Sequence, residues 1–278
     1  MKFPHFFQIA KLRFNQTFFL KLIKLLGLVS LEDIAEHLNE LRPKHGWFVR
    51  EYAQKRYFFT EHNARKIQAC RREIKGWYQK EWITYEERAV LLASLINSMD
   101  KVANTAGTYY AYLKTWHRKA LINFKFEFIQ PTLGKNSGSS FCEPAESLLS
   151  RRHFNIVYLD PPYNERSYPH YYHLPETIAQ ESTPCVHGMS GIHSNISSMS
   201  EFNKVKLAKQ ALIDVIDKAR FDLLVFHYAD NGIINNQDIV NILSNFQGLD
   251  EYYIDSKGYT TKEMPRDIKH HIYMVQNA

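Results

Sequence analysis

The sequence predicts an α/β protein in which a helical first half precedes a mostly parallel sheet. Two observations carry this prediction. Up to about residue 120, long segments begin at capping residues and carry apolar side chains at helical spacing. After residue 123, short β-rich runs alternate with amphipathic helical segments, the order typical of a parallel sheet. With 278 residues, 45% of them hydrophobic, the chain can bury a sizeable core in one large domain or two modest ones.

The helical half is marked by residues that can accept a hydrogen bond from the first turn of a helix. Ser30, Thr60 and Thr84 are such N-cap candidates. The expected helical segments are residues 1–41 with a break near Ser30, then 60–75, 84–99 and 109–120. The helix after Thr60 has a basic face that we expect to be exposed, formed by Arg65, Lys66, Arg71, Arg72 and Lys75.

The second half contains the predicted sheet. The expected strands are residues 124–129, 139–142, 155–159, 221–227, 252–255 and 271–275. The expected helices are residues 201–219 and 236–246, the second capped by Asn235 or Asn236. The composition therefore predicts three parts: a helical lead (1–43), a basic helical region suited to DNA contact (44–123) and an α/β portion (124–278).

Charge and cysteine content narrow the possible functions. The formal net charge of +6 favours a polyanionic partner, most simply nucleic acid, although many basic proteins bind none. Cys70, Cys142 and Cys185 are odd in number and match no zinc or redox spacing, which predicts buried thiols in a reduced cytoplasmic protein. No apolar run reaches the roughly 18 residues of a membrane span, and no signal peptide is recognisable.

The strongest chemical signal is the run Asp160-Pro161-Pro162-Tyr163 directly after a buried strand. Ligands of open α/β sheets bind where strands end, and the two prolines remove backbone donors beside the carboxylate. Asp160 and the carbonyl of Pro161 can therefore accept both hydrogens of an exocyclic amine, while Tyr163 can stack on a base that has left the duplex. The plainer interpretation is a rigid turn in which Asp160 caps a helix.

This run resembles the catalytic motif of adenine-specific (N6) DNA methyltransferases of bacterial type II restriction–modification systems. Further segments resemble the same group in the same order: residues 56–64, 101–114 and 164–179. The resemblance implies a partial Rossmann-like methyltransferase sheet, with a helical insertion preceding the catalytic strand. It also implies methyl transfer from S-adenosylmethionine to a flipped adenine of double-stranded DNA. The residues that it suggests for DNA or base contact are Asn164, Arg166, Tyr168, Asn104, Tyr112, Lys114, Arg71 and Arg72.

One expected device is missing from the sequence. The family holds S-adenosylmethionine on a Phe-x-Gly-x-Gly turn, and no two of the eleven glycines are spaced as Gly-x-Gly. Pro144 also stands where the family usually has an aspartate, so that Glu143 or Glu146 would have to replace it. We therefore expect a chain that lacks the N-terminal cofactor segment, being truncated or half of a split enzyme whose partner chain supplies that segment.

Two alternatives remain open at this point. The missing glycine motif favours a non-catalytic DNA-binding remnant of such an enzyme. An amino-methyltransferase acting on cytosine N4 or on RNA would carry a closely similar motif.

Overall fold

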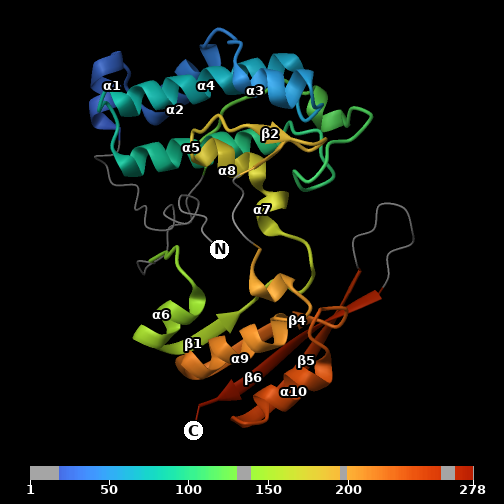
Figure 1. Ribbon diagram of the computed structural model, residues 1–278. Helices are drawn as coiled ribbons and strands as arrows, with labels where there is room; N and C mark the ends of the chain where they lie inside the picture. Colours follow the sequence, from blue (N-terminus) through green and yellow to red (C-terminus); the bar gives the residue numbers. More distant parts are fainter. Residues whose placement is uncertain (1–18, 130–138, 195–198, 258–266, 278) are drawn as a thin grey trace. The chain divides into compact units, whose positions relative to one another are not determined.

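A computed structural model describes residues 19–129, 139–194, 199–257 and 267–277 (Figure 1). The chain forms two compact units. We call the first the helical unit (Lys2–Cys142 with Pro169–Ser197) and the second the α/β unit (Glu143–Tyr168 with Ser198–Ala278). The first eighteen residues, which belong to the expected N-terminal helical lead, lie outside the described residues.

The helical unit contains mostly helices and one short hairpin. Its elements are α1 (Leu20–Leu26), α2 (Leu31–Glu40), α3 (Trp47–Val49), the π-helical turn η2 (Arg50–Gln54), α4 (Glu61–Gln79), α5 (Tyr85–Asp100), the 3-10 helix η3 (Arg118–Leu121), α8 (His173–Ala179), β2 (Val186–His187) and β3 (Ile192–His193). The short helix α7 (Tyr168–Tyr171) lies where the chain passes from one unit to the other.

The predicted caps are confirmed. Ser30 accepts a hydrogen bond from the backbone of Asp33, and Thr84 accepts one from Glu87, each within a reciprocal capping box. Thr60 caps α4 by accepting a hydrogen bond from the backbone of Asn63. Such caps satisfy orphan backbone donors and stabilise a helix by about 1 kcal/mol each. The expected helix at residues 109–120 is wrong: only η3 is helical there, and the preceding residues form an irregular loop.

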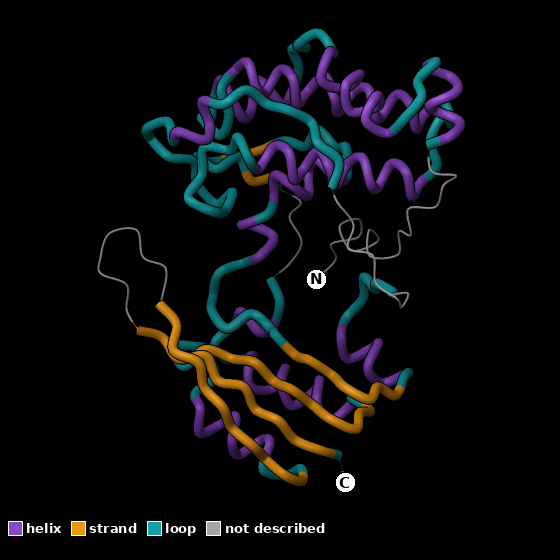
Figure 2. The backbone as a smooth tube through the Cα atoms, turned by 180° about the vertical axis from the view of Figure 1, so that it is seen from behind, coloured by secondary structure: helices purple, strands orange, loops and turns teal. Residues whose placement is uncertain are grey.

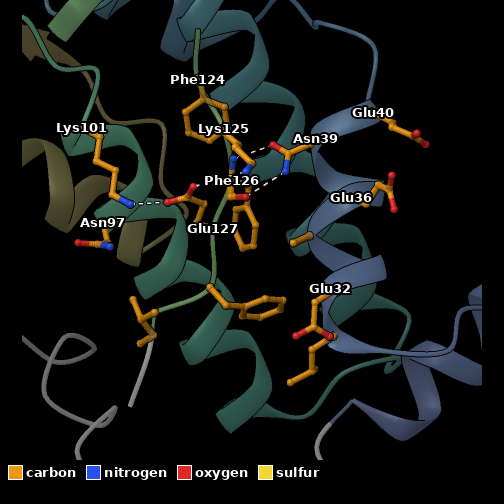
Figure 3. A pocket seen from close by; sticks show the side chains of 14 residues that line it. Glu32, Glu36, Asn39, Glu40, Asn97, Lys101, Phe124, Lys125, Phe126 and Glu127 are labelled. Atoms are coloured by element: carbon orange, nitrogen blue, oxygen red, sulfur yellow. Dashed lines mark hydrogen bonds and ion pairs between the residues drawn. The ribbon is translucent and has the colours of Figure 1, made fainter. Parts of the chain in front are cut away.

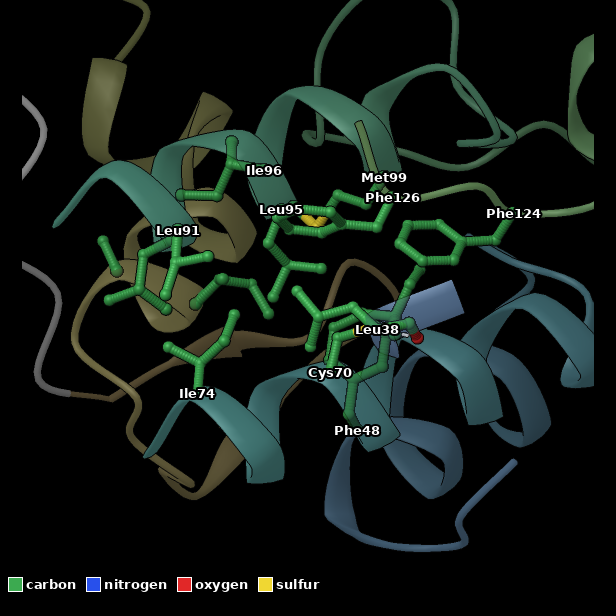
Figure 4. Packing of buried hydrophobic residues seen from close by; sticks show 14 of the residues in the cluster. Leu38, Phe48, Cys70, Ile74, Leu91, Leu95, Ile96, Met99, Phe124 and Phe126 are labelled. Atoms are coloured by element: carbon green, nitrogen blue, oxygen red, sulfur yellow. Dashed lines mark hydrogen bonds between the residues drawn. The ribbon is translucent and has the colours of Figure 1, made fainter. Parts of the chain in front are cut away.

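The core of the helical unit lies between α4 and α5 (Figure 4). Ile74 and Cys70 on α4 lie against Leu91 and Leu95 on α5, and all four side chains are buried. α5 is apolar on nearly every side because other elements cover it, including α8. Burying a large aliphatic side chain contributes about 1.5–3 kcal/mol, so this layer holds the unit together.

The segment after Ile122 is extended, but it is not the strand that the alternating pattern predicts. Phe124 and Phe126 are buried as the alternation requires. Their backbone groups bond to helix side chains and not to a neighbouring strand. Phe124 N donates to Asn63 Oδ1 at 2.9 Å. Phe126 N donates to Asn39 Oδ1 at 2.7 Å, and Asn39 Nδ2 donates to the carbonyl of Phe126 at 3.0 Å (Figure 3).

A pocket of about 1390 Å³ borders this extended segment (Figure 3). Glu32, Glu36 and Glu40 of α2 line one side of it, with Glu127 and Lys101 on the other. This acidic lining repels phosphate. The pocket is therefore not a surface that we assign to nucleic acid.

The α/β unit consists of a four-stranded sheet with helices. Its elements are α6 (Ala145–Arg151), β1 (His153–Leu159), the 3-10 helix η4 (Glu201–Asn203), α9 (Ala208–Lys218), β4 (Arg220–Ala229), α10 (Asn236–Leu243), β5 (Gln247–Lys257) and β6 (Asp267–Gln276). The strand order is β1-β4-β6-β5. β1 and β4 are parallel, whereas β6 is antiparallel to both of its neighbours. The sheet is therefore mixed, and the mostly parallel sheet that we expected is only partly correct.

The two faces of this sheet differ. The α-helices α6, α9 and α10 lie on one face (Figures 1 and 2), where Leu224 and Phe226 of β4 are buried. The opposite face presents side chains that are more than half exposed, among them Ile156 and Tyr158 of β1. Within the described part of the chain, β1 pairs with β4 alone and so has one free edge.

Three sequence expectations change with this description. The expected strand at residues 139–142 is not formed. The expected helix at residues 201–219 is split into η4 and α9. The compact units divide at Cys142/Glu143 and not near residue 123, because Phe124 and Phe126 belong to the helical core. No helix among the described residues combines the length and apolar character that a membrane crossing requires.

Candidate active site at the carboxyl end of the sheet

Asp160 lies directly beyond the last residue of β1. β1 pairs in parallel with β4, with Leu159 opposite Phe226, so Asp160 emerges beside His227 of β4. Oδ1 of Asp160 is 3.0 Å from Nδ1 of His227. The Asp160 side chain is 54% exposed, so its second carboxylate oxygen remains available to a ligand. The sequence therefore predicted the position of this carboxylate at a strand end, but not its histidine partner.

His227 is the first member of a pair of histidines. Its Nε2 is 2.9 Å from Nδ1 of His270 on β6, and the two ring planes are 23° apart with centroids separated by 5.0 Å. Ala229 is opposite His270 in the β4–β6 register, so His227 and His270 are diagonal neighbours on one sheet face. Two strands far apart in sequence thus place a chain of hydrogen bonds behind the carboxylate of Asp160.

Tyr163 packs against residues from β4 and β6. Its ring meets the ring of His270 edge to face at 6.1 Å and that of Tyr228 at 6.2 Å. Its carbonyl accepts a hydrogen bond from the backbone of Ile233 at 2.9 Å. Burial raises the pKa of Tyr228, so this neighbour stays a neutral phenol. The intervening Pro161 and Pro162 have no N–H to compete for a ligand on this side of Asp160.

The loop after Tyr163 is held by a residue that the sequence did not single out. Asn203 is buried, and its Nδ2 donates to the carbonyls of Asn164 (2.7 Å) and Arg166 (3.0 Å). The Asn164 side chain accepts from the backbone of Arg166 at 2.9 Å, so it shapes the turn. The side chain of Arg166 is exposed, as is that of Tyr168. The sequence held no signal for Asn203, because it lies inside the helix that we expected at residues 201–219.

In the helical unit, Asn104 has a structural role. It is buried, and its Nδ2 donates to the carbonyls of Tyr57 (3.0 Å) and Leu113 (2.9 Å). Its Oδ1 accepts from the backbone of His117 at 2.9 Å. These bonds fix the loop at residues 104–117 and attach it to the backbone of Tyr57. The same loop carries the exposed Lys114. The expectation that Asn104 itself contacts DNA is therefore corrected, because the amide is saturated inside the unit.

The same loop carries Tyr112 beside other aromatic side chains. The ring of Tyr112 contacts Tyr57 at 5.8 Å and Phe58 at 5.3 Å, and Tyr57 in turn contacts Trp116. Tyr57 is 50% exposed and Trp116 41% exposed. Exposed aromatic rings next to a cationic Lys114 are typical of surfaces that contact nucleic acid.

The two neighbouring arginines of α4 have different environments. Arg72 is exposed, as expected. Arg71 is buried, and its guanidinium donates to the carbonyl of Ser182 at 3.0 Å and lies over the rings of Trp47 and Phe48. The expectation that Arg71 faces a DNA phosphate is therefore wrong: the side of α4 that bears it packs into the helical unit.

Glu143 was the one candidate for cofactor binding. Its two carboxylate oxygens accept hydrogen bonds from Arg151 of α6 at 2.7 and 2.8 Å, and this pairing lowers the pKa of Glu143. Glu143 could bind a cofactor only if its hydrogen bonds with Arg151 were broken. The cofactor role of Glu143 therefore stays a prediction.

Comparison with known proteins identifies the family. The model of the D12 class of N6 adenine-specific DNA methyltransferases matches residues 18–242. The type II methyltransferase M.FokI of Planomicrobium okeanokoites is 34% identical over 198 residues, which cover 71% of this chain and 30% of that protein. The modification methylase StsI of Streptococcus sanguinis is 31% identical over 189 residues, covering 68% of this chain and 29% of that protein.

A shorter relative is covered more fully. The type II methyltransferase M.NlaIII of Neisseria lactamica is 29% identical over 230 residues, covering 81% of this chain and 68% of that protein. The chain thus spans about a third of the length of the first relatives named above. No solved structure shows a significant match. Because the family model spans most of the sequence and includes Asp160 to Tyr163, this chain belongs to the D12 class N6 adenine-specific DNA methyltransferase family.

Proposed function

We propose that this chain carries the amine-binding part of a site-specific DNA adenine-N6 methyltransferase. The observation that carries the proposal is the half-exposed carboxylate of Asp160 at the carboxyl end of β1, followed by two residues without N–H groups. Membership of the family supports adenine as the substrate base and S-adenosylmethionine as the methyl donor.

Asp160 and the Pro161 carbonyl act on the nucleophile. The lone pair of the adenine amine is delocalised into the ring, so the nitrogen is a weak nucleophile. Hydrogen bonds from both amine hydrogens, one to Asp160 and one to the Pro161 carbonyl, favour the tetrahedral nitrogen that attacks a methyl group. S-adenosylmethionine, when bound, would supply that methyl group in electrophilic form and depart as the neutral thioether, and the methylated amine would then lose one proton to water. Tyr163 stacks on the flipped base and keeps its amine beside Asp160.

The helical unit provides the DNA contacts in this proposal. Arg72 and Lys114 are exposed cations suited to phosphate, while Tyr112 and its aromatic neighbours are suited to a base or a sugar. Arg166 and Tyr168, which follow the catalytic motif, are also exposed and are candidates for contact near the flipped nucleotide. Asn164 contributes by shaping their loop.

The adenosine and methionine groups of the cofactor need a second set of residues. We propose that a glycine-rich segment carried by a separate chain or by another part of the protein holds them. Two observations support this: the 278 residues contain no Gly-x-Gly spacing, and β1 has a free edge within the described sheet. A parallel strand added beside β1 would end next to Asp160, because the carboxyl ends of parallel strands share one edge of a sheet.

The test is methylation of mixed-sequence duplex DNA with S-adenosylmethionine, with the glycine-rich segment of a relative supplied to the chain, followed by mass spectrometry of the nucleosides. N6-methyladenine is the expected product. Asp160→Ala should reduce turnover roughly hundredfold or more, as expected for lost transition-state hydrogen bonding, and should leave DNA affinity unchanged. Asp222→Ala is the matched control, because this exposed carboxylate lies near the other end of the same sheet.

The other outcomes separate the alternatives. N4-methylcytosine as the product would assign the chain to the cytosine branch. DNA binding without any methylated product, even when a glycine-rich segment from a relative is supplied, would favour a non-catalytic remnant. Near-normal turnover of Asp160→Ala would refute the assignment of the amine site.

A further inference from the structure

We propose that His227, itself fixed by His270, is a positioning residue that orients the carboxylate of Asp160 for the amine. This inference rests on the proposed function, because it assigns a role relative to the same carboxylate. It concerns two histidines that lie outside the catalytic motif and come from β4 and β6.

The direction of the hydrogen bonds follows from the chemistry of the groups. An ionised carboxylate only accepts hydrogen bonds, so Nδ1 of His227 carries the proton toward Asp160 Oδ1 (3.0 Å). In the neutral ring, Nε2 of His227 is then an acceptor. The group facing it at 2.9 Å is Nδ1 of His270, which donates. The Asp160 carboxylate thus sets the tautomer of His227, and the hydrogen bond from His270 holds the other side of the same ring.

In this arrangement the two carboxylate oxygens of Asp160 have different roles. Oδ1 is committed to His227, which fixes the plane of the carboxylate. Oδ2 is left to accept from the substrate amine. Without the imidazole, the carboxylate of a 54% exposed side chain would rotate in water, and an amine bond would have to order it.

The same pair of histidines also reaches the base-stacking residue. The ring of His270 meets that of Tyr163 edge to face at 6.1 Å and at 89°. The ring of His227 stacks on Tyr158 of β1 at 6.4 Å. The pair therefore contacts Asp160, Tyr158 and Tyr163, and it links the two side chains that hold the base in our proposal.

The first experiment reads the tautomer directly and needs no turnover. Ring ¹⁵N shifts of His227 are measured in the full chain, at a pH well above the ordinary histidine pKa of about 6.5. Nδ1 should be protonated and Nε2 unprotonated. Asp160→Ala should move His227 toward the Nε2-protonated form. If the tautomer of His227 is the same in the wild type and in Asp160→Ala, the proposal is overturned, whatever the methylation assay shows.

The second experiment uses methylation kinetics with conservative replacements, measured on the chain supplied with the glycine-rich segment of a relative. His227→Ala should lower kcat about tenfold or more and leave the KM for DNA unchanged. His227→Asn should recover most of this loss, because its amide nitrogen occupies the place of Nδ1 and donates to Asp160. His227→Gln should recover little, because its amide reaches the place of Nε2. Equal rates for the two amide variants, or wild-type kcat for His227→Ala, would contradict the inference.

A matched control is the next residue on β6. His271 lies on the opposite face of the strand, with its Nδ1 2.7 Å from Oε1 of Glu251. His271→Ala should change neither the His227 tautomer nor kcat. Thermal unfolding midpoints of all variants identify any that fail to fold. If Asp160→Ala retains turnover while the tautomer still depends on Asp160, the proposed function fails and the hydrogen-bonded pair stands.

Discussion

The guanidinium of Arg71 donates to the carbonyl of Ser182, 111 residues further along the chain, at 3.0 Å. Burial of this group lowers its pKa to about 10, and the rings of Trp47 and Phe48 lie beneath it. The bond ties α4 to the segment that follows α8. A positive charge that the sequence placed on a DNA-binding face thus serves the packing of the helical unit.

The first prediction concerns the cations that remain exposed. Replacing Arg72 and Lys114 together with Ala should weaken binding to every duplex sequence to a similar extent, because both residues contact phosphate in our proposal. The slope of log affinity against log salt should fall by about 2, one for each lost phosphate contact. Fluorescence anisotropy at several salt concentrations measures it. Lys125→Ala, an exposed lysine at the acidic pocket, is the control and should have no effect.

The second prediction concerns Tyr163. Tyr163→Ala should reduce methyl transfer severely, and Tyr163→Phe should be much milder, because stacking on the base uses the ring and not the hydroxyl. Steady-state kinetics on duplex DNA distinguishes the two. A Phe variant as impaired as the Ala variant would show that the hydroxyl, and not the ring, is the important group.

The third prediction concerns the cofactor. Calorimetry of the lone chain should show weak or no binding of S-adenosylmethionine, because no glycine-rich turn is present to hold its two ends. Adding a glycine-rich segment from a relative should raise both the affinity and the thermal midpoint, by mass action on the folded state. A micromolar dissociation constant for the lone chain, about −8 kcal/mol, would show that these 278 residues already hold the cofactor.

The fourth prediction concerns the pH dependence of stability. Burial of the ring lowers the pKa of His173 from 6.5 to about 4. Between these values the unfolded chain binds a proton that the folded chain does not. The free energy of unfolding is therefore highest, as far as His173 is concerned, above roughly pH 6.5. It falls by up to about 3 kcal/mol as the pH falls from 6.5 to 4. Urea unfolding at pH 7 and pH 5 measures the loss.

His173→Gln provides the comparison for this pH experiment. Glutamine can still donate toward the Tyr109 carbonyl, which lies 2.9 Å from Nε2 of His173, but it does not titrate. The variant should lose less stability between pH 7 and pH 5 than the wild type. Burial raises the pKa of the nearby Glu176, so its titration also changes the stability over this pH range. This change is the same in the wild type and in the variant, and it cancels when the two losses of stability are compared.

The fifth prediction concerns the extended segment between helices. Asn63→Ala should destabilise the fold by about 1–3 kcal/mol, because it leaves the buried N–H of Phe124 without its acceptor. Asn39→Ala should do the same through Phe126. Asn97→Ala, an exposed asparagine at the same pocket, should change little. Equal effects of all three would show that these side-chain bonds do not hold the segment.

The sequence by itself determined the local features of this protein. The caps at Ser30, Thr60 and Thr84 begin helices because their hydroxyls satisfy orphan donors within the next turn, which depends only on neighbouring residues. Asp160 at the end of a β-rich run was predictable for the same reason, since the strand and the two prolines are contiguous. The family motif is equally local, because its four residues are contiguous.

Only the tertiary structure decided which residues share a site and which are buried. The alternation of Phe124 and Phe126 signals burial but not the partner of the backbone, and here Asn39 and Asn63 replace a neighbouring strand. Asn104 is saturated by bonds to residues up to 47 positions away. His227 and His270 are in contact because β6 pairs antiparallel with β4. The two histidines are 43 residues apart in the sequence, and no local pattern predicts that they meet. Long-range register, set by packing of the whole sheet, places them behind Asp160.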